Sequence, residues 1–263
     1  MKTNGQKHPL AEVFGYQVSD RSRDAARFRK NRLCPFNNII PNCTKDKAQS
    51  PLGVCSIFHA EDFVITCPIR FRQNWIIADD AAQFFFGHDA NWTALTEVRL
   101  KDAEGGSAGN IDMVLCAYDD SGRIEDFGAL EIQAVYISGN VRRPFEYYMA
   151  DPETNCHMDW SQQPNCPRPD YLSSSRKRLV SYLTSKGLII HNKRVKQIVV
   201  TQNSFLTTLP AFPTTHDSLS DFAFFCYDLE YRQHDESWQL KLANAVYTQY
   251  TDVCDLLISA SGA

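Results

Sequence analysis

The sequence has no apolar run that approaches the roughly 20 residues needed to cross a lipid bilayer. Its first residues, MKTNGQKHPL, also lack the apolar stretch of a secretory signal. We therefore expect a cytoplasmic protein with no membrane partner. There are no internal repeats and no long low-complexity segment. A content of 43% hydrophobic and 22% charged residues in 263 residues is that of a globular protein.

An excess of positive charge is also lacking. The formal net charge of −4 excludes a surface coated in basic residues. It does not exclude a nucleic-acid partner, because a local basic cleft can bind phosphates while the rest of the surface stays acidic.

The chain has nine cysteines but no Cys-x-x-Cys pair among the first four, which are spaced by 8, 11 and 11 residues: Cys34, Cys43, Cys55 and Cys67. Disulfides are not expected in a reducing compartment. Four thiolates can hold Zn²⁺ or one iron ion tetrahedrally. With this wide spacing, scattered buried cysteines are an equally good interpretation. The loop-rich character of residues 34–67 indicates a segment pinned by something other than a hydrophobic core.

Four β-branched or aromatic runs predict strands, at 111–118, 127–137, 195–202 and 222–231. The Asp-Asp-Ser-Gly sequence at 119–122 predicts a turn that joins the first two into an antiparallel hairpin. Helices are expected from Ser173 or Ser174 to Gly187 and over about 243–259. Strands and helices in this order predict an α/β domain with a mixed sheet.

The pattern Asp112 … Glu131-Ile132-Gln133 predicts a metal-binding centre that cleaves phosphodiester bonds. Glu131 and Gln133 share one face of their strand, and Asp112 can reach the same edge across the hairpin. Mg²⁺ prefers oxygen ligands, usually one or two carboxylates with waters and phosphate oxygens. On spacing alone, an exposed strand residue is the simpler interpretation of Glu131. The apolar residues around it indicate a buried strand, where a carboxylate needs a partner or a metal.

Several short motifs occur in an order that resembles one known family. They are FGALEIQ at 127–133, AEVFGYQV at 11–18, CPF at 34–36, GVC at 53–55, CP at 67–68, TQNSF at 201–205 and FAFFCYDLE at 222–230. The chain resembles the NotI-type restriction endonucleases, members of the PD-(D/E)XK nuclease superfamily in which glutamine occupies the usual lysine position. The resemblance covers most of the chain.

The resemblance implies a role for each residue of the pattern. Asp112 would be the aspartate of the PD element, although Ile111 replaces the proline. Glu131 would be the second metal ligand. Gln133 would orient groups by hydrogen bonding, because a neutral amide cannot accept a proton as lysine can. Glu97 would be an additional upstream acid, with Asp102 and Glu104 as alternative counterparts.

The resemblance also implies an architecture, namely a PD-(D/E)XK mixed β-sheet flanked by helices over 76–263 and an N-terminal lobe over 1–75. The four cysteines would hold a structural iron or zinc ion in that lobe. Such enzymes usually cut palindromes as symmetric dimers, so a homodimer on double-stranded DNA is expected. The basic residues expected to contact DNA are Arg142, Arg143, Lys193 and Arg194, and arginines that read guanine would suit a GC-rich site.

The function expected is therefore that of a Mg²⁺-dependent type II restriction endonuclease. Two alternatives remain open at this point. One is a metal-stabilised DNA-binding protein that has the nuclease fold but does not cleave. The other is a repair nuclease with no sequence-specific target.

Overall fold

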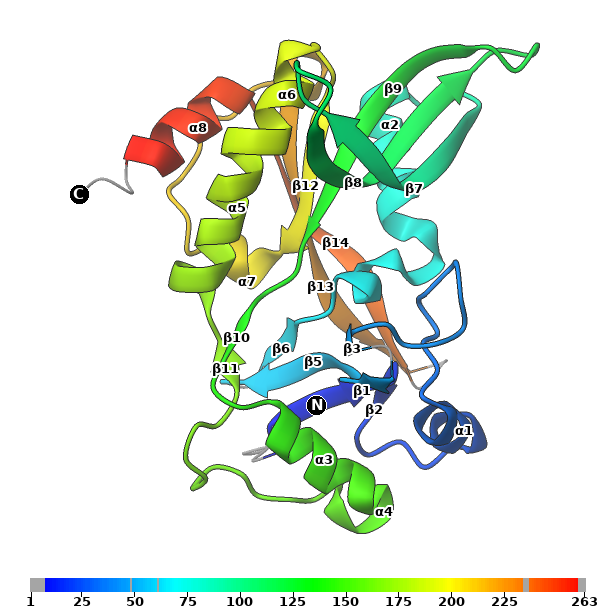
Figure 1. Cartoon of the computed structure of the whole chain (residues 1–263), viewed down its shortest axis with the longest axis vertical. Coiled ribbons are helices and arrows are strands. Elements are labelled where there is room, and N and C mark those ends of the chain that lie inside the picture. The colour runs from blue at the N-terminus through cyan, green and yellow to red at the C-terminus, as the bar shows by residue number, and fades with distance from the viewer. Residues whose placement is uncertain (1–7, 48, 61, 234–236, 260–263) are drawn as a thin grey trace. The chain divides into compact units, whose positions relative to one another are not determined.

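The computed structural model describes residues 8–47, 49–60, 62–233 and 237–259 (Figure 1). The chain forms two compact units. The first takes in residues 1–74, 134–171 and 228–241, and the second takes in 75–133, 172–227 and 242–263. The functional division at residue 75, into a metal-stabilised lobe and a nuclease core, stays a prediction.

The second unit is built on a six-stranded sheet, in which two adjacent strands, β13 and β14, continue into residues 228–241 of the first unit. The strand order is β14-β13-β12-β9-β8-β7. Its strands are β7 (Trp92–Lys101), β8 (Ser107–Tyr118), β9 (Ile124–Gln133), β12 (Gln197–Gln202), β13 (Phe222–Arg232) and β14 (Ser237–Thr248). Strand β12 is parallel to both β9 and β13, whereas β7, β8 and β9 are antiparallel neighbours. The predicted mixed sheet is thus confirmed, and so are the four predicted strands, except that the second ends at Gln133 rather than at residue 137.

The turn between β8 and β9 is the one that the Asp-Asp-Ser-Gly sequence predicted. Asp119 Oδ1 accepts hydrogen bonds from the backbone N–H of Ser121 and of Arg123, each at 2.9 Å. Gly122 has a φ of +81°, which glycine adopts without a steric penalty. This local chemistry fixes the register of the hairpin and, with it, the relative positions of the two strands that carry the carboxylates.

Helices cover both faces of this sheet, as Figure 1 shows. They are α2 (Ile76–Phe86), α5 (Arg176–Tyr182), α6 (Leu188–Asn192), α7 (Asn203–Leu206) and α8 (Tyr250–Ser259). A Cβ at Gly128 would lie 2.3 Å from the ring of Phe85, so α2 packs directly on the backbone of β9. The next residue, Ala129, points to the other face, where it joins a core cluster with Ile190 of α6. Glu131, two residues further on, shares the face that α6 covers.

The predicted helix from Ser173 to Gly187 begins as expected but does not stop at the glycine. The helical run covers residues 171–192 and includes two π-helical turns, Tyr171–Ser175 and Leu183–Gly187. Gly187 has right-handed helical angles, φ −57° and ψ −40°. A Cβ there would lie 3.3 Å from the ring of Tyr250, so this glycine serves close packing rather than helix termination.

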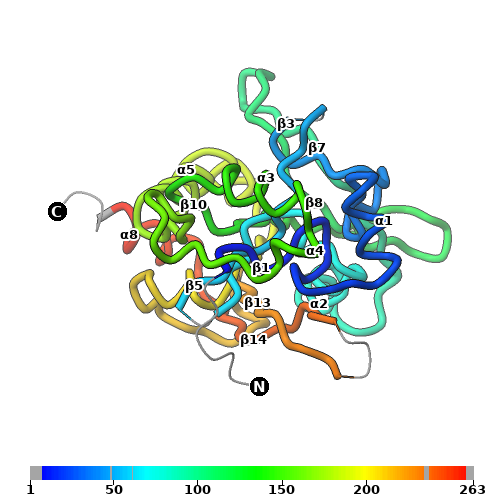
Figure 2. Tube along the Cα trace, turned by 90° about the horizontal axis from the view of Figure 1, so that it is seen from below, coloured from blue at the N-terminus to red at the C-terminus, as the bar shows by residue number. Residues whose placement is uncertain are grey.

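The predicted helix over 243–259 is only partly correct, because residues 237–248 form β14 and α8 begins at Tyr250. Val246 therefore belongs to the strand, where β-branched residues also fit well. The backbone N–H of Tyr250 donates to Asp221 Oδ1 at 2.7 Å. Helix α8 lies beside α5 in both views (Figures 1 and 2), and Tyr250 Oη donates to the carbonyl of Leu183.

The first unit contains a four-stranded sheet with the order β2-β1-β5-β6. Its elements are β1 (Leu10–Val13), β2 (Tyr16–Gln17), β3 (Asp46–Lys47), β4 (Ser50–Pro51), β5 (Val54–His59), β6 (Asp62–Ile65), β10 (Ile137–Ser138), β11 (Arg168–Pro169), α1 (Arg23–Asn31), α3 (Arg142–Ala150) and α4 (Pro152–Asn155). Strands β5 and β6 show that residues 34–67 hold more regular structure than their loop-rich sequence indicated.

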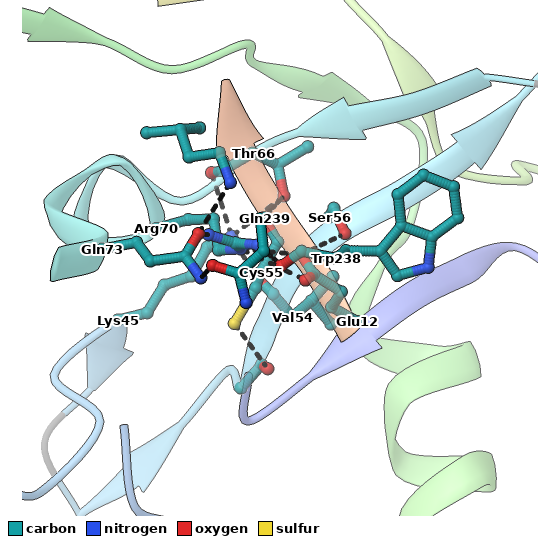
Figure 3. Close-up of polar contacts among 12 residues, drawn as sticks. Glu12, Lys45, Val54, Cys55, Ser56, Thr66, Arg70, Gln73, Trp238 and Gln239 are labelled. Carbon is teal, nitrogen blue, oxygen red and sulfur yellow. Dashed lines mark hydrogen bonds and ion pairs between the residues drawn. The ribbon is translucent and has the colours of Figure 1, made fainter. Parts of the chain in front are cut away.

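The first unit contains a buried ion pair between Glu12 and Arg70 (Figure 3). Arg70 Nε lies 3.1 Å from both carboxylate oxygens of Glu12, and both side chains are almost fully buried. Glu12 also accepts a hydrogen bond from Ser56 Oγ at 2.8 Å, while Arg70 donates to Gln73 Oε1 at 2.7 Å. The remaining hydrogen-bonding capacity of both charges is largely used, which is what makes their burial tolerable.

Among the described residues, no helix is both long enough and apolar enough to span a membrane.

Candidate active site

Asp112 lies on β8 and Glu131 lies on the neighbouring strand β9. The antiparallel register pairs Met113 with Leu130, so that the next residues along, Asp112 and Glu131, are side by side. Residues opposite each other in an antiparallel pair have Cβ atoms roughly 5 Å apart on the same face. The backbone N–H of Ile132 donates to Asp112 Oδ2 at 2.7 Å, which holds that carboxylate against β9. The two predicted carboxylates therefore converge.

The surroundings of Glu131 make its negative charge costly. Its side chain is only 15% exposed. Burial, and after it the charge of Asp112, raises the pKa of Glu131 to about 7. Lys186 and the backbone N–H of Asp112 act in the opposite direction. A carboxyl group that titrates near neutrality because of burial and a like charge is typical of a functional site.

Lys186 is the site residue that the sequence did not reveal. It belongs to the π-helical turn Leu183–Gly187. Its Nζ donates to both carboxylate oxygens of Glu131, at 2.6 and 2.8 Å. It lies 55 residues from Glu131 along the chain, in a segment with no motif. The one available signal was indirect: a buried carboxylate needs a partner, and the neutral Gln133 cannot be a cationic one.

Gln133 ends β9 and is 7% exposed. It lies two residues beyond Glu131 and so points to the same face of the strand. Its carbonyl accepts a hydrogen bond from Thr201 Oγ1 at 2.8 Å, and the same two residues pair in the parallel register of β9 and β12. The backbone at the end of β9 is therefore held firmly next to the two carboxylates.

Glu97 lies on β7, the strand on the other side of β8. The pairs that flank it are Thr96–Met113 and Val98–Ile111. This register places Glu97 beside Asp112. Its φ of +55° is in the left-handed region, which costs a residue with a side chain of this size free energy of order 1–3 kcal/mol. This position beside Asp112 is compatible with the upstream acid that the sequence predicted.

The alternative acids, Asp102 and Glu104, lie in the loop that joins β7 to β8. There Asp102 Oδ1 accepts a hydrogen bond from the backbone N–H of Gly106 at 2.6 Å, which stabilises the turn. Of the three acids, Glu97 is the one whose register matches Asp112.

The described residues contain no group of three or more His, Cys, Asp or Glu side chains arranged to hold a metal ion. Glu97 thus does not complete a three-ligand set with Asp112 and Glu131. Two convergent carboxylates are nevertheless what Mg²⁺ commonly takes from a protein, with waters and substrate phosphates as its other ligands. The donor set on β8 and β9 fits that ion.

The four cysteines singled out from the sequence, Cys34, Cys43, Cys55 and Cys67, come together round one cavity of the first unit. Cys34 and Cys43 flank a bridge between Leu33 and Asn42. The backbone N–H of Cys67 donates to the carbonyl of Cys55 at 3.2 Å, which joins these two residues. None of the nine cysteines, all of which lie in the described part of the chain, forms a disulfide bond.

The four cysteines line one cavity of about 10 Å³, roughly the volume that one water molecule requires. Burial, opposed by backbone hydrogen bonds and reinforced by Cys67 and Cys43, raises the pKa of Cys34 to about 11. Burial likewise raises the pKa of Cys55 well above its usual range, with Cys67 as the next cause. As they stand, the thiols surround the cavity without forming a closed metal-binding group. Their chemistry and common location fit a soft metal ion.

Two of the four basic residues predicted to contact DNA begin α3 in the first unit. Arg142 forms an ion pair with Asp46 and lies 3.7 Å from Glu146. The guanidinium of Arg143 lies 5.7 Å from the centre of the Trp160 ring, in a cation–π contact. Arg142 is thus already neutralised by carboxylates, whereas Arg143 lines a cavity of about 350 Å³ together with Trp160.

The other two, Lys193 and Arg194, follow α6 in the second unit and are exposed. The backbone N–H of Arg194 donates to the carbonyl of His191 at 2.8 Å, and Arg194 has a φ of +57°. The turn therefore presents two adjacent basic side chains to solvent.

The sequence matches the family described as "Restriction endonuclease NotI" over residues 12–240. The chain belongs to the NotI restriction endonuclease family. The match includes β8 and β9 with both carboxylates, the helical run with Lys186, and the four cysteines. No curated protein sequence matches the chain at a significant level.

Membership in the NotI family settles the class of activity. The chain is a type II site-specific deoxyribonuclease, and its substrate is double-stranded DNA. The expectation of a restriction endonuclease, made from the ordered motifs, is confirmed at this level.

Proposed function

We propose that the chain is a Mg²⁺-dependent endonuclease of the PD-(D/E)XK superfamily that cuts both strands of a GC-rich palindrome. The observation that carries the proposal is the convergence of Asp112 and Glu131 on adjacent strands, with the Ile132 N–H holding the first carboxylate at 2.7 Å. Two carboxylates brought together on neighbouring interior strands of the sheet repel each other, and a divalent cation relieves that repulsion.

Each residue of the site has a defined task in this proposal. Asp112 and Glu131 would hold Mg²⁺. When bound, the ion supplies charge neutralisation at the phosphate and lowers the pKa of a coordinated water. Gln133, fixed through its own backbone at the end of β9, would orient groups by hydrogen bonding. Glu97, held beside Asp112 by the register of β7 and β8, would bind a water of the metal shell.

Digestion of DNA tests the proposal. Purified protein with Mg²⁺ is expected to convert plasmid and genomic DNA into discrete bands, and sequencing of the ends is expected to show one short GC-rich palindrome. The same incubation with EDTA is expected to leave the DNA intact, because the carboxylates alone cannot activate a water.

A smear in place of bands would indicate a nuclease without a sequence-specific target. DNA binding with no cleavage under any divalent cation would indicate a binding protein that has only the fold. Either result would contradict the proposed function.

We further propose that Cys34, Cys43, Cys55 and Cys67 hold one structural iron or zinc ion in the first unit. The support is their position round one small cavity, together with the backbone hydrogen bond that joins Cys67 to Cys55. Four protein ligands leave no open position for chemistry, so the ion would fix the fold of residues 34–67 rather than act on DNA. Binding would convert the buried thiols into thiolates, with release of protons.

Elemental analysis tests this site. We expect about one iron or zinc ion per chain to survive dialysis against EDTA, because closed tetrathiolate sites bind metal very tightly. Cys55→Ser is expected to lose the ion, whereas Cys116→Ser, a buried cysteine on β8, keeps it. Folded and active protein that contains neither metal would refute the proposal.

DNA contacts and assembly complete the proposal. Lys193 and Arg194 are exposed and adjacent, and Arg143 lines a cavity with Trp160, so these side chains are available to phosphates. Arg142 would contact DNA only after it leaves Asp46. A palindrome read by one kind of chain calls for two copies related by a twofold axis, so we propose a homodimer.

A further inference from the structure

The ammonium group of Lys186 is fully engaged inside the carboxylate site. Nζ has three N–H donors, and it lies within hydrogen-bonding distance of three oxygens. Two are the carboxylate oxygens of Glu131, at 2.6 and 2.8 Å, and the third is the carbonyl of Asn110, at 2.7 Å. The side chains of Lys186 and Glu131 are 17% and 15% exposed. An ion pair buried to this extent has a better defined geometry than an ion pair between mobile surface side chains.

The local structure is built to deliver this side chain. Lys186 lies in a π-helical turn, a feature that interrupts α-helices frequently at functional sites. Nζ lies 5.5 Å from the centre of the Tyr182 ring. A Cβ at Gly109 would lie 3.7 Å from Lys186 Cδ, so a larger residue at 109 would contact the lysine stem. The helical run that carries Lys186 covers the same face of the sheet to which Glu131 points.

The chemistry of the site requires a cation that β9 itself does not provide. Asp112 and Glu131 are two like charges on neighbouring strands, and phosphodiester cleavage adds further negative charge at the phosphate. Gln133 is a neutral amide, so it cannot balance the charges of the two carboxylates or the charge at the phosphate. Lys186 brings one positive charge to this point from a different element of the fold.

Resting on the proposed function, we propose that Lys186 is a positioning residue for DNA cleavage. It holds the Glu131 carboxylate by both oxygens and supplies the positive charge that Gln133 lacks. It acts through Glu131, so its loss impairs the chemical step more than the binding of DNA.

Steady-state kinetics provide the first test. Lys186→Met is expected to lower kcat on the order of a hundredfold, the effect of a misplaced reacting group, with KM for DNA changed by less than about threefold. Lys186→Arg is expected to recover about tenfold of that loss, because a guanidinium also binds a carboxylate by both oxygens. The matched control is Lys177→Met, an exposed lysine on α5 of the same helical run, and it is expected to keep the kcat of the unmodified enzyme. If the methionine variant does not fold, Lys186→Gln takes its place.

Binding of Mn²⁺ to the free protein provides the second test, which does not depend on activity. Lys186→Met frees both oxygens of Glu131, so Mn²⁺ is expected to bind about fivefold more tightly at pH 8, a coupling of ordinary size for groups in contact. In a Glu131→Gln background the same substitution is expected to change Mn²⁺ binding by less than about twofold. A lysine with a merely structural role would weaken binding equally in both backgrounds.

The outcomes separate this inference from the function on which it rests. If the unmodified protein cuts DNA and the Lys186→Met variant cuts it with the same kcat, the inference about Lys186 is wrong but the proposed function still holds. Unmodified protein that cuts no DNA would overturn the proposed function, and the Mn²⁺ measurement would then decide the role of Lys186. In either case, if Lys186→Met changes Mn²⁺ binding by the same factor in the unmodified protein and in the Glu131→Gln background, Lys186 does not act through Glu131.

Discussion

Glu131→Gln is expected to lower the rate of DNA cleavage by a factor on the order of 10³, the upper end of the effect of removing one group that stabilises charge in the transition state. The substitution keeps the shape of the side chain and leaves an oxygen for Lys186. It removes the negative charge that Asp112 and Glu131 would together offer a divalent cation. Single-turnover cleavage of a plasmid that carries the site, with Mg²⁺ in excess, measures the change.

The control for this substitution lies on the same strand. Glu125 is exposed on β9, and Glu125→Gln is expected to cleave at the rate of the unmodified enzyme. DNA binding by Glu131→Gln without Mg²⁺ is expected to stay within about threefold of the unmodified protein, because phosphate contacts elsewhere carry the affinity. A Glu131→Gln enzyme that cleaves at more than a tenth of the normal rate would remove Glu131 from the active site.

Arg70→Met is expected to lower the free energy of unfolding by about 3–5 kcal/mol, the cost of leaving one partner of a buried ion pair uncompensated. Arg70 is fully buried and donates to Glu12, to Gln73 and, at 2.9 Å, to the carbonyl of Trp238 (Figure 3). Its guanidinium also lies 4.2 Å from the centre of the Phe36 ring. Methionine has a similar volume but leaves the Glu12 carboxylate without its cation. Equilibrium unfolding in urea measures the loss.

Two comparisons make this prediction specific. Lys241→Met breaks a pair with Glu230 whose side chains are 61% and 53% exposed, and it is expected to cost about 1 kcal/mol or less. Glu12→Met combined with Arg70→Met is expected to be less destabilising than Arg70→Met alone, because no charge is then left buried. If the free energy of unfolding of Arg70→Met lies within about 1 kcal/mol of that of the unmodified protein, the ion pair contributes little to stability.

The hairpin of β8 and β9 could be predicted because its determinants are local. β-branched runs, a turn sequence with Asp119 and Gly122, and the alternation of side chains along a strand are all visible in a window of about 20 residues. That window also contains Asp112 and Glu131, and their convergence follows from the register alone. The helical errors have the opposite origin. The segments around Gly187 and Val246 are compatible with more than one local structure. Packing against Tyr250 keeps Gly187 in the helical run, and pairing in the sheet places Val246 in β14.

Sequence alone thus determined the family, the order of the main strands and the carboxylate pair, because ordered motifs and strand periodicity depend on neighbours in the chain. Tertiary structure decided what surrounds that pair. Lys186 reaches Glu131 across 55 residues, and Arg70 reaches the carbonyl of Trp238 across 168. Contacts at such separations leave no local pattern, since they depend on how a helical run crosses a sheet or how distant segments meet in one core. The cation of the site therefore became visible only when the chain was folded.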